Sequence, residues 1–346
     1  MTGLPRGGKW PALFAALAFF CAFGAQVRAA EEPLPSWRDT PTRAAILDFV
    51  ARVTDPAGGD FVPPEARIAV FDNDGNLWAE QPVYFQLLFA VDRLEALAAE
   101  DPALRRQPPF SEVLANGPAA LAGLDEAALV KLVLATHTGL DSATFNGLVA
   151  DWGASATHPR FGQRYTDLTY APMRELLDPL EDNGFTCYIV SGGGVAFMRA
   201  WAPAAYGIPP ERIIGSRFQL TYRADDSGGT LQRLPELAHI NDGPGKPVGI
   251  QQVIGRRPIF ASGNSDGDLE MLTWTTGGEG PRFGLLLHHT DAEREWAYDR
   301  ESHVGRLDEG LERAPALGWT VVDMARDWAR VFAFEAPAEA ATEAVH

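Results

Sequence analysis

Residues 68–78 read IAVFDNDGNLW, and the fold prediction starts from this stretch. Its four apolar residues predict a short buried strand, and the glycine and asparagines after them predict a turn. Asp72 and Asp74 place two carboxylates directly behind that strand. Like charges this close cost free energy unless a cation or a chemical role compensates them. The stretch therefore predicts a strand that ends at a charged functional site.

Strand and helix patterns alternate in the second half of the chain. A turn of the type Asp-Ser-Gly-Gly at residues 226–229 also predicts a hairpin between residues 213–222 and 230–234. Strands that are separated by helices imply βαβ units, so we expect an α/β fold with a Rossmann-like parallel sheet as its core. The expected strands are 67–71, 186–190, 258–262, 283–288 and 319–322, and the expected helices are 41–50, 172–183, 193–201, 245–254, 268–274 and 327–332.

The segment between the first strand and this alternating region has a helical pattern throughout. One helix should begin at Pro82, and another should cover residues 127–135. A helical insert of this length has the size of a small domain. We therefore expect a core from residues 30–76 and 170–335, a helical cap at 77–169 and a disordered tail at 336–346.

The first 29 residues have the pattern of a secretory signal peptide. Arg6 and Lys9 precede an apolar run at residues 11–24, and small residues follow at the cleavage spacing. The run is short for an uncleaved membrane anchor, which is the alternative. Cleavage would leave Cys187 as the one cysteine and hence no internal disulfide, which favours a bacterial periplasm as the location.

The composition limits the class of partner. The chain is acidic, with a formal net charge of −17, which argues against nucleic acid as a partner. After removal of the signal peptide we expect no membrane association. An acidic surface also repels anionic substrates at long range, so a site for an anion must be locally positive.

Polar clusters follow three of the predicted strands. They are residues 72–76, 191–194 and 263–268, and Lys246 lies between the second and the third. Ligands bind at the carboxyl ends of strands in an open parallel sheet, so the clusters should converge. Carboxylates suit Mg²⁺, a serine before glycines at a helix N-terminus can hold an anion, and a lysine adds positive charge. This combination indicates phosphoryl transfer.

These clusters resemble the four motifs of the haloacid dehalogenase superfamily, in their order and strand context. The first motif corresponds to residues 72–76, the second to Ser191, the third to Lys246 and the fourth to residues 263–268. The resemblance is greatest to the phosphoserine phosphatase-like branch, which includes periplasmic phosphorylcholine phosphatases. A helical cap follows the first motif in that branch, as residues 77–169 would do here.

The resemblance implies a role for each matching residue. Asp72 would be the nucleophile that forms an aspartyl-phosphate, and Asp74 would act as general acid and then as general base. Ser191, together with Gly192, and Lys246 would hold the phosphoryl oxygens. The implied cofactor is Mg²⁺, and the implied partner is a small phosphorylated substrate.

Two positions depart from the family pattern. Asn76 stands where threonine is usual, and its amide could still donate to the phosphoryl group. Asn264 stands where the first aspartate of the fourth motif is usual, so the metal ligand there could be Asn264, Asp266 or Asp268. We expect a metal site of Asp72, Asp74, Asn264 and Asp268.

The resulting expectation is an Mg²⁺-dependent phosphatase that hydrolyses a small phosphomonoester. One alternative is a dehalogenase-type hydrolase, but such enzymes generally lack the acidic residue that Asp74 supplies. The other is a catalytically weak protein that binds phosphate esters, which the asparagines at positions 76 and 264 keep open.

Several residues also have purely structural interpretations. Ser191 could cap a helix and Lys246 could lie on the surface. Trp78, Tyr84 and Trp152 could form an aromatic wall for a quaternary ammonium group, although aromatics at such spacings more often belong to a core. Glu80 could bind a substrate ammonium, but we expect a solvated glutamate. Structural roles are expected for His137, His158, Arg160, Arg164, His288 and His289.

Overall fold

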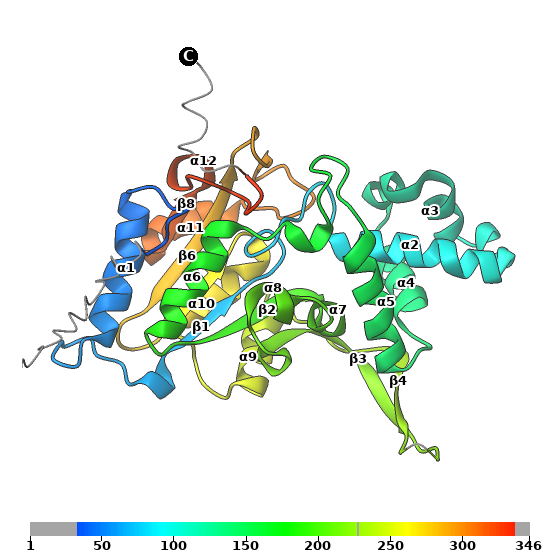
Figure 1. Cartoon of the computed structure of the whole chain (residues 1–346), viewed down its shortest axis with the longest axis horizontal. Coiled ribbons are helices and arrows are strands. Elements are labelled where there is room, and N and C mark those ends of the chain that lie inside the picture. The colour runs from blue at the N-terminus through cyan, green and yellow to red at the C-terminus, as the bar shows by residue number, and fades with distance from the viewer. Residues whose placement is uncertain (1–32, 227, 336–346) are drawn as a thin grey trace, which may run out of the picture. The chain divides into compact units, whose positions relative to one another are not determined.

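The computed structural model describes residues 33–226 and 228–335, which fold around one sheet (Figure 1). The strand order is β4-β3-β2-β1-β5-β6-β7, and β8 pairs with β6. Pairing within the core is parallel, which confirms the expected α/β fold. The expected signal peptide and tail lie outside the described residues. The strands are β1 (Ile68–Phe71), β2 (Thr186–Gly194), β3 (Ile213–Arg223), β4 (Thr230–His239), β5 (Phe260–Gly263), β6 (Phe283–Thr290), β7 (Ala297–Tyr298) and β8 (Thr320–Asp323).

The central strand β1 is buried on both faces. It pairs with β2 on one side and with β5 on the other, and all four of its residues are buried. Its run of apolar residues without alternation is typical of a strand covered on both faces. Phe71 is in register with Ile189 and with Ser262, so β1 and β5 end within one residue of the same level, whereas β2 continues beyond it.

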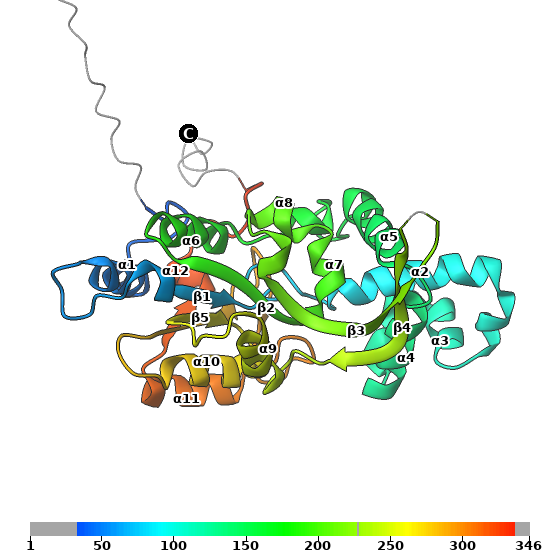
Figure 2. The same ribbon diagram turned by 90° about the horizontal axis from the view of Figure 1, so that it is seen from below.

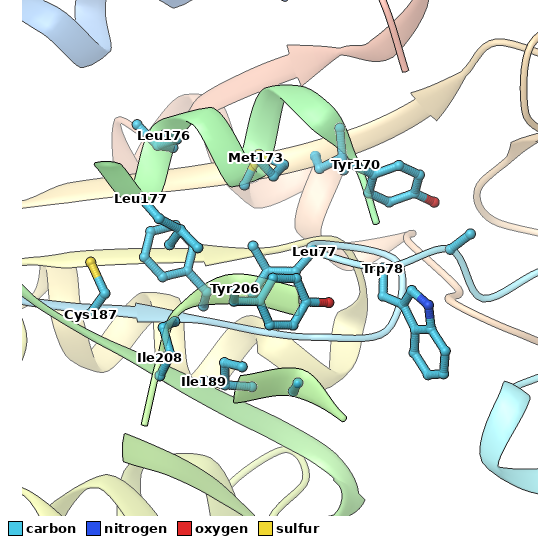
Figure 3. Packing of buried hydrophobic residues seen from close by; sticks show 14 of the residues in the cluster. Leu77, Trp78, Tyr170, Met173, Leu176, Leu177, Cys187, Ile189, Tyr206 and Ile208 are labelled. Atoms are coloured by element: carbon cyan, nitrogen blue, oxygen red, sulfur yellow. The ribbon is translucent and has the colours of Figure 1, made fainter. Parts of the chain in front are cut away.

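Helices cover both faces of the sheet, as Figure 2 shows. Alternate residues of β1 belong to two cores: Ala69 and Phe71 pack with α1 and α6, and Ile68 and Val70 with α9, α10 and α11. Figure 3 shows part of the first core, where Met173, Leu176 and Leu177 of α6 lie near Cys187 and Ile189 of β2. These helices are α1 (Pro41–Thr54), α6 (Ala171–Asp182), α9 (Gly245–Val253), α10 (Leu269–Thr276) and α11 (Glu309–Leu317).

Residues 77–169, all of them described, form helices and turns. Their helices are α2 (Phe85–Glu100), α3 (Phe110–Asn116), α4 (Glu126–His137) and α5 (Ser142–Ser155). Part of this helical insert has a separate apolar core that includes Leu94 and Leu132. The predicted hairpin forms as β3 and β4, and Arg233 of β4 exchanges backbone hydrogen bonds with Gly139 and Leu140. The hairpin therefore joins the sheet to the insert.

The strand that precedes the second motif is longer than predicted. We expected it to end at Val190, with a helix from Gly193, but β2 continues to Gly194 and α7 (Val195–Arg199) follows. The pairing with β3 shifts after Val190, and Gly194 pairs with Ser216. Ser191 and its glycines thus lie in an extended strand end, so the predicted helix N-terminus next to Ser191 is not formed.

The prediction for the last helix was also wrong. Residues 328–332 are not helical, whereas α11, which we did not predict, and α12 (Met324–Asp327) are. The Ala329 N–H donates to the Ser36 carbonyl, and Trp328 pairs with Trp37. The backbone groups of this segment bond to the first described residues, and they are therefore not available for a helix.

The described helices include none that is both long and apolar enough to cross a membrane.

Candidate active site

Polar residues gather where β1, β2 and β5 end. Asp72 follows β1, Ser191 lies near the end of β2, and Asn264 follows β5. Because the strand order is β2-β1-β5 and all three run parallel, these ends share one edge of the sheet. The site therefore follows from the strand pattern that the sequence predicts.

Lys246 lies in the first turn of α9 and connects two carboxylates. Its Nζ donates to Asp72 Oδ1 at 2.8 Å and to Asp268 Oδ1 at 2.5 Å. The lysine is only 1% exposed, so it is not a surface residue. A buried ammonium that touches two carboxylates offsets part of their mutual repulsion.

Burial and mutual repulsion shift the pKa values of this group. Burial raises the pKa of Asp72 well above its usual range, Asp268 adds to the effect, and Lys246 opposes it. For Lys246, burial alone would lower the pKa, but Asp268 and Asp72 outweigh burial and raise it. Lys246 therefore remains a cation beside the carboxylate of Asp72.

Asp74 faces Ser191 across the same edge. The Ser191 hydroxyl donates to Asp74 Oδ2 at 3.3 Å, and the Gly193 N–H donates to Ser191 Oγ at 2.9 Å. Burial raises the pKa of Asp74, against the hydrogen bond from Ser191. A carboxyl with a raised pKa next to a nucleophile is suited to donating a proton.

Asn76 has a different position from the one we expected. Its amide donates to the Asp72 carbonyl at 3.0 Å and accepts from the Ser262 hydroxyl at 2.7 Å. Asn76 is fully buried and is not among the described residues that line the cleft. The structure thus places this amide beneath the turn, where it connects β1 to β5, and not at the predicted phosphoryl site.

The three candidate ligands of the fourth motif have distinct surroundings. Asp268 accepts from Lys246 with Oδ1, and from the Asn264 N–H, the Ser265 N–H and the Ser265 hydroxyl with Oδ2. Asp266 accepts from the Asp308 and Gly310 N–H groups. These contacts give both aspartates protein partners, and the place of Asp268 in a metal site stays a prediction.

Asn264 differs from both aspartates. Its Oδ1 is buried and has no hydrogen-bond partner within the described residues. An unpaired buried oxygen is costly unless something absent from the coordinates binds it. The described residues include no group of three His, Cys, Asp or Glu side chains with the arrangement of a metal site. The Asp72 carboxylate, the Asp74 backbone carbonyl and the free Asn264 oxygen nevertheless make a donor set that fits a cation with oxygen ligands.

The site opens into a cleft of about 470 Å³. Asp72, Asp74, Ser191 and Lys246 line its core side. The other side is partly apolar and consists of Leu87 from α2, Val133 from α4, Phe218 from β3 and Leu237 from β4. An enclosed site with polar groups at one end is typical of a small-molecule cleft.

Some residues that line or support the site were missed in the sequence. Gln86 accepts from the Gly194 N–H at 2.8 Å, and Asn241 donates to the Ser191 carbonyl at 3.0 Å. A loop after β7 also reaches the cleft with His303 and Arg306. Neither Gln86 nor this loop belongs to a motif or follows a core strand, so nothing in the local sequence indicates their place.

Glu80 is buried, so the expectation of a solvated glutamate was wrong. It is 1% exposed, and its Oε1 accepts from Asn264 Nδ2 and from the Tyr298 hydroxyl. Burial raises the pKa of Glu80 well above its usual range, against the hydrogen bond from Tyr298. The carboxylate also lines the cleft.

The aromatic wall is not formed. Trp78 packs edge-on against Phe85 and at 4.2 Å between ring centroids from Trp201, and Trp152 stacks on Tyr165. Only Tyr84 of the three proposed wall residues lines the cleft. The core interpretation of Trp78 and Trp152 therefore holds.

The six histidines and arginines for which we expected structural roles all have protein partners. His137 contacts Gln86 and Thr136, and His158 contacts the Gln81 carbonyl. His289 lies between the Gly75 carbonyl and Glu295. The other three also contact protein groups: Arg160 lies over Trp296, Arg164 pairs with Asp167, and His288 pairs with Asp299.

Comparison with known proteins gives one family match. The model of the haloacid dehalogenase-like hydrolase family matches residues 69–273. Among curated proteins, none matches the chain.

Solved structures give likenesses of fold at low identity. A protein of unknown function from Bordetella pertussis Tohama I is 17% identical, over 75% of this chain and 98% of its own, with a TM-score of 0.47. A phosphoserine phosphohydrolase-like protein from Francisella tularensis is 18% identical, over 64% and 87%, with a TM-score of 0.35. A probable phosphoserine phosphatase from Vibrio cholerae is 14% identical, over 76% and 62%, with a TM-score of 0.37.

Proposed function

The chain belongs to the haloacid dehalogenase-like hydrolase family, and on that premise we propose that it is an Mg²⁺-dependent phosphatase of small phosphomonoesters. One observation supports this most directly. The Asp72 carboxylate lies at the base of the cleft, 2.8 Å from the Lys246 ammonium, and Asp74 lies beside it, bonded to Ser191. A nucleophile, a proton donor and phosphate-binding groups are thus within one small site.

In the proposed reaction, a carboxylate oxygen of Asp72 attacks phosphorus and forms an aspartyl-phosphate. The bond from phosphorus to the ester oxygen breaks, and Asp74 gives its proton to the departing alkoxide. Asp74 then takes a proton from water, which attacks the aspartyl-phosphate and releases phosphate and free Asp72. Each proton that Asp74 donates is thereby recovered.

The phosphoryl oxygens need positive charge and hydrogen-bond donors. Lys246 supplies the charge, and the Ser191 hydroxyl and the Gly192 N–H are the proposed donors. Asp268 is better understood as the residue that holds Lys246 in place, since its two oxygens bind protein donors. A Mg²⁺ ion held by Asp72, the Asp74 carbonyl and Asn264 would offset the negative charge of the phosphoryl group.

A dehalogenase-type activity has less support, because such a reaction has no use for an acid at the position of Asp74. A binding protein without catalysis would not need the contact between Asp74 and Ser191. We also propose, on the sequence pattern alone, that residues 1–29 direct export to a periplasm, which cell fractionation tests. Residues 77–169 are proposed as the cap.

The test is phosphate release from p-nitrophenyl phosphate, with Mg²⁺ and with chelator. Asp72→Asn should remove activity by at least about 10³-fold, because the amide cannot form the acyl-phosphate. Asp151→Asn, at an exposed position on α5, is the matched control and should keep wild-type activity. Undiminished release by Asp72→Asn would exclude the mechanism, and release unaffected by chelator would exclude the metal. Phosphorylcholine and phosphoserine should be included as substrates.

A further inference from the structure

Glu80 is a buried carboxylate that the proposed reaction does not use. We propose that Glu80, held by Tyr298, is a positioning residue that orients the Asn264 amide, so that Asn264 can bind a divalent cation. This inference rests on the proposed function, because it concerns the same cation.

Three separate parts of the chain meet at this carboxylate. Glu80 comes from the turn after β1, Asn264 follows β5, and Tyr298 lies in β7. Glu80 Oε1 accepts from Asn264 Nδ2 at 2.9 Å and from the Tyr298 hydroxyl at 2.8 Å. Two donors on one oxygen form a fixed contact for the amide.

The contact determines which way the amide faces. The Nδ2 group of Asn264 points to Glu80 Oε1, which also accepts from the Tyr298 hydroxyl, and Oδ1 of the amide points away from it. That oxygen is the buried atom that lacks a partner in the described part of the chain. The orientation thus leaves one oxygen of the amide free at the end of β5, as a cation ligand requires.

Two glycines leave the space that this pair occupies. A Cβ at Gly75 would overlap both the Asn264 amide and the Glu80 carboxylate, and a Cβ at Gly305 would overlap the carboxylate. Both glycines have a positive φ, of 72° and 64°. The turn after β1 and the loop after β7 are therefore shaped around Glu80, which favours a specific role over incidental burial.

The charge count supports a cation here. Asp72, Asp74, Asp268 and Glu80 are close together, and Lys246 touches two of them. An amide oxygen is a neutral ligand, so Asn264 adds no charge of its own to bind a divalent ion. Glu80 instead acts by holding the amide, since it binds Nδ2 on the side opposite the ligand oxygen.

Mg²⁺ binding to the full-length protein, measured by isothermal titration calorimetry with MgCl₂ alone, tests the proposal without substrate. Glu80→Gln should weaken Mg²⁺ binding about 10- to 100-fold, the usual effect of losing a residue that supports a metal ligand. Tyr298→Phe should weaken it less, by a few fold on the order of the loss of one supporting hydrogen bond. Glu301→Gln, at an exposed position in the same loop, is the matched control and should bind as wild type does.

A reciprocal exchange separates positioning from general structure. Asn264→Asp alone places two carboxylates in contact, so its melting temperature without Mg²⁺ should fall and should rise steeply when Mg²⁺ is added. Combining Asn264→Asp with Glu80→Gln exchanges amide and carboxylate. The double variant should bind Mg²⁺ within a few fold of wild type, because the exchange restores a hydrogen bond between an amide and a carboxylate at these two positions.

The outcomes distinguish the two proposals. If wild type does not bind Mg²⁺, the metal part of the proposed function and this inference both fail. If wild type binds Mg²⁺ but Glu80→Gln and Tyr298→Phe bind it equally well, only the inference fails. Unchanged Mg²⁺ affinity with a raised KM for cationic phosphoesters would instead assign Glu80 to the substrate and would also overturn the inference.

Discussion

The two walls of the cleft differ in chemistry and in how they are held. On the core wall, Asp72 and Lys246 are buried, ionic and connected by short hydrogen bonds. The opposite wall, which we name the cap wall, is formed by Leu87 and Val133 of the helical insert and by the β3–β4 hairpin. Leu87 and Val133 are half-buried and apolar, and they come from helices with a partly separate core. Charges need rigid partners to be stable when buried, whereas apolar contact needs only shape and area. We infer that the core wall performs the chemistry and that the cap wall selects the alcohol part of the substrate.

The apolar wall continues beyond the active site. A second cavity of about 170 Å³ lies between α4 and the hairpin, and it shares Val133, Phe218 and Leu237 with the main cleft. Leu129, Val130 and Leu134 extend its apolar lining. The cap wall thus has room for an alkyl or aryl group, and it offers few partners for a polar one.

The largest difference should appear between a lysine of the core wall and a lysine of the helical insert that lies outside the cleft. Lys246→Met leaves Asp72 and Asp268 buried without their cation, so the free energy of unfolding should fall by about 3–5 kcal/mol and activity by at least about 10²-fold. Lys131→Met changes an exposed lysine of α4 that donates to the Pro108 carbonyl, and its effect should stay below about 1 kcal/mol. Urea unfolding and phosphate release measure both effects. Equal losses in the two variants would contradict the comparison.

The second test concerns His137, a buried histidine of α4 in the helical insert whose imidazole stays uncharged. His137 accepts from Gln86 Nε2 at 3.1 Å, and burial, together with Arg233, lowers the pKa of His137 from 6.5 to about 3. Between these values the unfolded chain binds a proton that the folded chain does not. Stability from His137 is therefore complete above about pH 6.5, and it is lost as the pH falls towards 3.

Between pH 6.5 and pH 3 the loss in the free energy of unfolding should reach a few kcal/mol, on the order of the full pKa shift of His137 expressed as a free energy. Unfolding free energies measured between pH 7 and pH 4 should fall less steeply in His137→Gln than in wild type. His303→Gln, at an exposed position, is the control and should keep the wild-type slope. A His137→Gln slope equal to that of wild type would show that this histidine is not the titrating group.

The smallest effect concerns the cap wall itself. Along a series from methyl to hexyl phosphate, kcat/KM should rise by about fourfold for each methylene, as about 0.8 kcal/mol of burial predicts. Leu237→Ser should flatten the series, whereas Leu231→Ser, also on β4 but not in the cleft lining, should leave it unchanged. A flat series in wild type, with activity on every member, would refute selection by an apolar wall and leave the chemistry intact.

Much of the core wall was predictable from local sequence. Short apolar runs that end in polar clusters predicted β1, β2 and β5, and the parallel order then implied one shared edge for Asp72, Ser191 and Asn264. This works because strand burial and turn chemistry depend on neighbouring residues. The cap wall was less predictable, since helix periodicity shows that α2 and α4 exist but does not show which of their residues face the hairpin.

The directions of the side chains in the site depended on distant partners. Asn76 turns beneath the strand because Ser262, 186 residues away, donates to its amide. Glu80 is buried because Tyr298, 218 residues away, donates to it. A hydrogen bond between distant segments leaves no periodicity in either one, so the sequence predicted neither the direction of the Asn76 side chain nor the burial of Glu80. The strand pattern was enough for the fold and for the shared edge of Asp72, Ser191 and Asn264, whereas the arrangement around Asn264 arose from tertiary contacts alone.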